Sequence, residues 1–165
     1  AQACADAKVT LISPFVGRIL DWYKKAEGVD QYPIEKDPGV LSVKKIYNYY
    51  KQHGIPTQVM GASFRSTAQV LGLAGCDLLT IAPNLLAQLE QDQQTLTAQL
   101  STEAAQQAEK IERPAQTKES FKAELEHDLM AFQLLQSGID GFIKAREQLS
   151  RLLRQSFGID AEIKA

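Results

Sequence analysis

Short segments with strand character recur three times in the first half of the chain. Residues 9–12 combine β-branched and apolar side chains without alternation, and Ser13-Pro14 closes that run. Residues 57–61 (TQVMG) and 78–81 (LLTI) are predicted as the second and third short strands. An uninterrupted apolar run of this length is typical of a strand that is buried on both faces, as in a parallel sheet. The pattern therefore predicts three parallel strands.

Stretches with helical spacing separate these strand segments. Apolar residues recur on one side of segments 17–28 and 41–54, and a glycine ends each segment. Segments 63–75 and 84–92 continue the alternation after the second and third predicted strands. Strands that alternate with helices indicate βαβ units with right-handed crossovers. We therefore predict an α/β fold.

The second half of the chain has a different character. Residues 93–116 are rich in Gln and Ala, and Pro114 interrupts them. Helix propensity is good there but the apolar stripe is thin, which predicts a partly exposed helix with an irregular exit. Further along, Leu135, Ile139, Phe142, Leu149 and Leu153 recur at helical intervals. These five residues predict a long amphipathic helix, although Gly138 and Gly141 weaken the expectation that it is straight.

Composition narrows the function classes. The chain has 44% hydrophobic residues and a net charge of -2, so it offers no electrostatic case for binding nucleic acid. No apolar run approaches the roughly 20 residues that span a bilayer. Cys4 and Cys76 lack metal-ligand spacing, and a reduced, cytoplasmic compartment is the default expectation.

Arginine follows two of the predicted strands. Segments 13–18 and 60–65 end in Arg18 and Arg65, and Ser63 lies beside the second arginine. Polar groups at the carboxyl ends of parallel strands line the site in barrel enzymes, and guanidinium forks bind phosphate in a bidentate manner. The pattern therefore indicates a phosphate pocket. The alternative is that each arginine pairs with a carboxylate at the surface.

Longer strings carry a family resemblance. LISPFVGRILDWYK, DPGVLSVKKIYNYYK, VMGASFR and LAGCDLLTIAP resemble consecutive segments of transaldolase, and HDLMAFQLLQSGIDGFIKAREQL resembles its C-terminal helix. The resemblance implies the C-terminal part of a (β/α)8 TIM barrel. Residues 1–92 would be the last three β/α units, residues 93–116 a helical connector, and residues 117–165 C-terminal helices that pack on the barrel. The tail 156–165 has no counterpart in the family.

The resemblance also implies a reaction. Transaldolases belong to the pentose phosphate pathway and transfer a dihydroxyacetone unit between sugar phosphates through a lysine Schiff base, with no cofactor and no metal. Matching motifs make Arg18, Ser63 and Arg65 the phosphate ligands. Ser13 corresponds to the serine near the Schiff-base centre, and Phe15 to the aromatic residue near the catalytic water.

The lysine and the catalytic acids of that family would precede residue 1. Three strands are fewer than the eight of a barrel, which has about 250 residues. We therefore expect a fragment that is inactive alone, with the missing N-terminal half as its partner, no membrane partner, and a homodimer left open. Two alternatives remain: a truncated, non-catalytic phosphate-binding or assembly module, and a phosphate-binding module with another chemistry.

We expect the other potentially reactive side chains to have structural roles. His53 precedes a helix-ending glycine and suits the negative end of a helix dipole, while His127 is expected to cap the long helix. Cys76 has the character of a small core residue. An aromatic cluster predicts helix-to-sheet packing; it comprises Trp22, Tyr23, Tyr47, Tyr49 and Tyr50. Lysines at 8, 24, 25, 44 and 45 are expected on the strand-start end or on solvated helix faces.

Overall fold

The computed structural model describes residues 1–158. The chain divides into two compact units, Ala1–Thr117 and Lys118–Ala165. The first unit contains the sheet and the second contains two helices.

The predicted parallel sheet is confirmed in the first unit. Strands β1 (Leu11–Ile12), β2 (Gln58–Gly61) and β3 (Leu78–Leu79) lie in the order β1-β2-β3, and both pairings are parallel. Each strand is shorter than predicted. At the start of β2, the Thr57 hydroxyl donates to the Val9 carbonyl at 2.7 Å, next to the backbone hydrogen bond from the Gln58 N–H to the Thr10 carbonyl at 2.9 Å.

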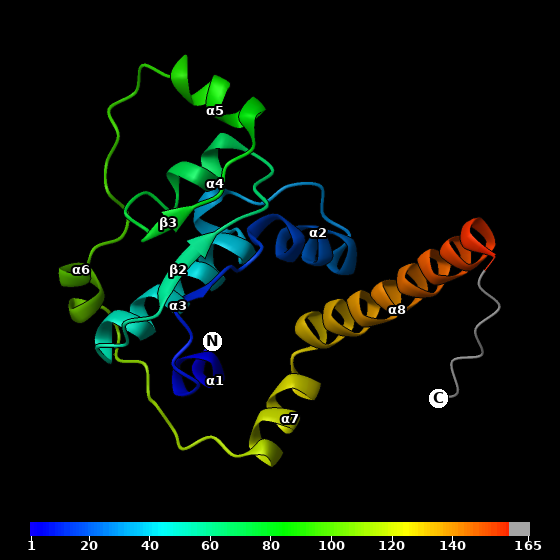
Figure 1. Ribbon diagram of the computed structural model, residues 1–165. Helices are drawn as coiled ribbons and strands as arrows, with labels where there is room; N and C mark the ends of the chain where they lie inside the picture. The colour runs from blue at the N-terminus through cyan, green and yellow to red at the C-terminus, as the bar shows by residue number, and fades with distance from the viewer. Residues whose placement is uncertain (159–165) are drawn as a thin grey trace. The chain divides into compact units, whose positions relative to one another are not determined.

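Helices alternate with these strands, as expected for part of a (β/α)8 barrel. Figure 1 follows the order through the first unit, in which α3 contacts β2, α2 and α6. The helices are α1 (Gln2–Asp6), α2 (Val16–Glu27), the 3-10 turn η1 (Ile34–Lys36), α3 (Pro38–Gln52), α4 (Thr67–Leu71), α5 (Pro83–Glu90) and α6 (Thr102–Gln107).

Two helices differ from the sequence-based expectation. Helix α4 has five residues: Ser66 caps its start, so residues 63–65 lie outside the helix, and Gly72 is the C-cap at its end. The helix predicted within residues 93–116 is confined to α6. The chain before α6 is held instead by the Ala74 carbonyl, which accepts from the backbone N–H groups of Gln99 and Leu100.

The core of the first unit forms around α3. Tyr47, Tyr49 and Tyr50 are buried, so these three members of the predicted aromatic cluster are core residues. Trp22 and Tyr23 are partly buried and meet edge to face at 5.0 Å between ring centroids. Val16, Val59, Val70 and Leu73 are among the apolar residues from other parts of the unit that join this core.

The second unit pairs α7 (Lys118–His127) with α8 (Leu129–Phe157). Helix α8 confirms the predicted amphipathic helix and continues through Gly138 and Gly141 for 29 residues. His127 ends α7 and does not start the long helix, because Asp128 is the N-cap of α8 and its carboxylate accepts from the Ala131 N–H at 2.9 Å. None of the helices within residues 1–158 is long and apolar enough to cross a membrane.

Candidate functional site

The carboxyl ends of β1 and β2 continue side by side beyond the strands. Phe15 forms a parallel bridge with Ala62, and the Val16 N–H donates to the Ala62 carbonyl at 2.9 Å. The Gly17 N–H donates to the Ser63 carbonyl, also at 2.9 Å. These contacts place the start of α2 against the loop after β2, so segments 13–18 and 60–65 meet.

Close backbone approach at this point depends on glycine. A Cβ atom at position 17 would lie 2.2 Å from the Ser63 carbonyl oxygen and 2.8 Å from the Arg65 side chain. Ser63 itself has a φ of 62°, in the left-handed region that non-glycine residues rarely adopt. Residues held in such conformations concentrate at functional sites, where the surrounding contacts fix them.

The Arg65 guanidinium is engaged within its own loop and with α2. Its Nη2 and Nε donate to Asp21 Oδ2 at 2.7 and 3.1 Å. Its Nη1 contacts the Ser63 carbonyl and hydroxyl oxygens at 3.1 and 3.2 Å. The pair with Asp21 is the carboxylate pairing that the sequence left open as an alternative. The Arg65 side chain is 42% exposed, so solvent reaches its guanidinium.

Arg18 is the third residue of α2 and lies over the Phe15 ring, with 4.6 Å from Cζ to the ring centroid. Within residues 1–158 no carboxylate forms an ion pair with Arg18, and its side chain is exposed. Ser13 directly follows β1 and is exposed. The fold therefore brings Phe15 and Arg18, which follow β1, beside Ser63 and Arg65, which follow β2. Ser13 lies directly at the end of β1.

Two buried polar residues beneath this loop were not recognised in the sequence. Asp37 is 3% exposed and Gln69 is 1% exposed. The Gln69 amide accepts from the Arg65 backbone N–H and donates to Asp37 Oδ2, both at 2.8 Å. A signal was available, because Ser66 and Gln69 have the S-x-x-Q spacing of a capping box.

Asp37 lies directly before α3. Its Oδ1 accepts from the N–H groups of Gly39 and Val40 at 2.8 and 3.1 Å, so Asp37 is the N-cap of α3. Pro38 occupies the first helical position, which its fixed φ and missing N–H favour.

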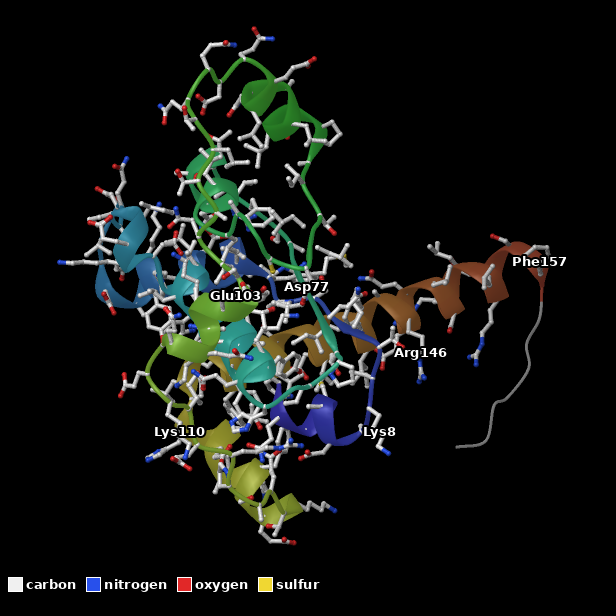
Figure 2. All side chains as sticks on the ribbon, turned by 90° about the vertical axis from the view of Figure 1, so that its left-hand side faces the viewer. Lys8, Asp77, Glu103, Lys110, Arg146 and Phe157 are labelled. Atoms are coloured by element: carbon white, nitrogen blue, oxygen red, sulfur yellow. The ribbon has the colours of Figure 1, made fainter. Side chains whose placement is uncertain are left out.

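The other candidates have structural roles. His53 caps the end of α3, and its Nε2 lies 2.7 Å from the Ile111 carbonyl oxygen. The Cys76 thiol donates to the Val59 carbonyl, and burial raises the pKa of that thiol, so it is a poor nucleophile. Lys8 precedes β1 and extends away from the ribbon (Figure 2), at the opposite end of the strands from Arg65. No lysine within residues 1–158 is buried.

A separate apolar cavity of about 590 Å³ lies between α4, α5 and the chain before α6. Its wall includes Val70, Leu79, Leu89 and Leu96, and none of the five predicted site residues. Within residues 1–158 no group of three His, Cys, Asp or Glu side chains could hold a metal ion.

Comparisons with known proteins give the family. Residues 1–153 match the model of the Transaldolase/Fructose-6-phosphate aldolase family. Over 155 residues the chain is 54% identical to a transaldolase of Thermosynechococcus vestitus, which covers 94% of this chain and 39% of that relative. It is 53% identical to a transaldolase of Cellvibrio japonicus over 93% of this chain and 48% of that relative. The chain thus spans less than half the length of these relatives, and it belongs to the transaldolase/fructose-6-phosphate aldolase family.

Proposed function

We propose that this chain carries the phosphate-binding side of a transaldolase, an enzyme that transfers a dihydroxyacetone unit between sugar phosphates. The observation that carries the proposal is that Arg18 and Arg65 both follow the carboxyl ends of adjacent parallel strands. The hydrogen bond between Gly17 and Ser63 holds these two segments together. Relatives named transaldolase, about half identical to this chain, support it.

The geometry suits a sugar phosphate. A phosphate dianion would approach the exposed guanidinium of Arg18 and the partly exposed guanidinium of Arg65, where it would compete with Asp21, and the Ser63 hydroxyl would add a hydrogen bond. Ser13 and Phe15 lie at the end of β1, where the sugar carbons would extend from the phosphate. We assign Ser13 to the neighbourhood of the Schiff base and Phe15 to that of the catalytic water.

The covalent step needs a desolvated lysine, and none lies within residues 1–158. A Schiff-base lysine is deprotonated in a desolvated pocket, and the resulting iminium withdraws electrons from the bond that breaks. Since the lysines of residues 1–158 are exposed or half-exposed, we assign that lysine to an N-terminal barrel segment outside this chain. The chain alone is then inactive, and that segment is its partner. We place the reaction in the pentose phosphate pathway of the cytoplasm, a compartment in keeping with the free Cys4 and Cys76.

Two experiments test the proposal. The first titrates the chain with fructose 6-phosphate and with fructose, using Arg65→Ala as the variant. Arg113→Ala is the control, because Arg113 pairs with Asp6 at similar exposure and lies outside the site. We expect the phosphorylated sugar to bind more tightly, and only Arg65→Ala to lose that preference. Equal binding of both sugars, or no effect of Arg65→Ala, would contradict the phosphate assignment.

The second experiment traps the Schiff base. The chain is treated with fructose 6-phosphate and borohydride, alone and with the N-terminal segment of the Cellvibrio japonicus relative, and intact masses are measured. The expected sugar adduct appears on the added segment and never on this chain. An adduct on this chain would refute the assignment of the lysine. Phosphate binding without any adduct would favour the non-catalytic module.

A further inference from the structure

Gln69 connects the Arg65 loop to the interior of the first unit. It is the third residue of α4, and its amide reaches past the N-cap Ser66 to the backbone N–H of Arg65. In an ordinary capping box the side chain at this position bonds to the N-cap N–H. Here the contact falls one residue earlier, on the arginine itself.

Asp37 determines which way that amide points. A carboxylate without a proton only accepts hydrogen bonds, so the NH₂ group of Gln69 must face Asp37 Oδ2. The amide oxygen is then directed at the Arg65 N–H. Because the other carboxylate oxygen is occupied by the N–H groups at the start of α3, Asp37 is itself fixed.

The loop is therefore held at two points. Ser63 is held by the Gly17 N–H and keeps its left-handed φ, while Arg65 is held by Gln69. Between these points the guanidinium turns back onto Ser63 through Nη1. A ligand group fixed before binding loses less conformational entropy when the ligand arrives.

We propose that Gln69, oriented by Asp37, is a positioning residue that holds Arg65 in place to receive the phosphate of the substrate. This inference rests on the phosphate-binding function proposed above and extends it to two residues that do not touch the ligand. Gln69 acts only through Arg65, so its effect depends on the arginine being present.

The test is a double-mutant cycle on ligand affinity. Gln69→Met has nearly the same length as Gln69 and removes both hydrogen bonds. The dissociation constant of fructose 6-phosphate is measured for the wild-type chain, Gln69→Met, Arg65→Ala and the double variant. We expect Gln69→Met to weaken binding about fivefold, as one lost hydrogen bond of ordinary strength predicts. In the Arg65→Ala background the same change should have little further effect.

Lys51→Met is the matched control. It removes a half-buried ion pair with Asp77 at the opposite end of β2 from the arginine loop, so it lowers stability without reaching the site. We expect its affinity for fructose 6-phosphate to equal that of the wild type. An equal loss of affinity in Lys51→Met and Gln69→Met would reduce the role of Gln69 to general stability and overturn the inference.

Asp37→Asn provides a second variant if Gln69→Met does not fold. Asparagine remains a good N-cap for α3, but its NH₂ group would oppose that of Gln69 and turn the Gln69 amide away from Arg65. Weaker phosphate binding by this folded variant would support the inference, and unchanged binding would overturn it.

These measurements distinguish the phosphate site from the positioning role of Gln69. If Arg65→Ala loses affinity while Gln69→Met and Asp37→Asn bind like the wild type, the positioning role is wrong and the phosphate site stands. If the wild-type chain does not distinguish fructose 6-phosphate from fructose, the phosphate site is wrong and the positioning role falls with it.

Discussion

The Gly17 N–H and the Ser63 carbonyl join two βα connections at a distance of 2.9 Å, and the position of the Gly17 Cα leaves no room for a side chain. Gly17→Ala would put a methyl group 2.2 Å from that carbonyl oxygen, and backbone on both sides would have to move. We expect a loss of about 1–3 kcal/mol in the free energy of unfolding, measured by urea denaturation. Gly138→Ala is the control, since nothing lies within 4 Å of its Cβ position in α8 and alanine should favour the helix there. Equal stability of Gly17→Ala and the wild type would contradict the close approach.

At the proposed phosphate site, Asp21 would compete with phosphate for Arg65. Its carboxylate occupies Nε and Nη2 of the guanidinium and would repel a dianion at the same place. We expect Asp21→Asn to tighten binding of fructose 6-phosphate by about twofold to fivefold, the range of an exposed ion pair, and added salt to reduce the difference. Asp6→Asn, which removes the partner of Arg113, should leave affinity unchanged. Weaker binding by Asp21→Asn would mean that the carboxylate orients the arginine and does not compete.

Asp77 ties the start of β2 to α3. Its two oxygens accept from Lys51 Nζ at 2.6 Å and from the Val59 N–H at 3.0 Å, and the side chain is mostly buried. Asp77→Ala leaves a backbone donor and an ammonium group without this partner. We expect the free energy of unfolding to fall by about 2 kcal/mol, with the affinity for fructose 6-phosphate unchanged. Thermal and urea unfolding check the first expectation, and a loss of affinity would contradict the separation between this end of β2 and the site.

Tyr50 gives the chain a sensitivity to alkali. Burial raises the pKa of its phenol to about 12 from an ordinary value of 10.0, and the hydroxyl donates to the Ala1 carbonyl at 2.8 Å. The unfolded chain loses this proton first, so the stability of the folded state falls as pH rises from 10.0 to about 12. Tyr50→Phe should flatten this part of the stability profile, measured by urea unfolding across that pH range. An unchanged slope would show that other groups, such as Tyr47 and Tyr49, whose pKa values burial also raises, account for the loss.

The sequence predicted the features that depend on local pattern. Short segments with strand character predicted the strands, their alternation with helices predicted the parallel pairing, and helical spacing predicted α2, α3 and α8. The order of strands and helices was enough to place Arg18 and Arg65 at neighbouring strand ends. Their role as phosphate ligands stays a prediction.

Features that depend on distant partners were not predictable in this way. Gln69 looks like an ordinary helical residue until the fold brings Asp37, 32 positions away, against its amide. Asp21 lies one turn after Arg18 in the sequence, yet its partner is Arg65, 44 positions away. The length of α6 was overestimated because helix propensity does not register that Leu100 is buried in the core and that its N–H bonds to Ala74.

The three-stranded sheet has a practical consequence for protein engineering. Within residues 1–158, β1 and β3 each pair with β2 alone, so each presents one unpaired edge. Unpaired backbone groups accept a further strand. If a barrel were divided so that one piece held these three strands, the outer edges of β1 and β3 would match the two free edges of the other piece. If each piece were fused to one member of an interacting pair, closure of the sheet would report that the pair had met.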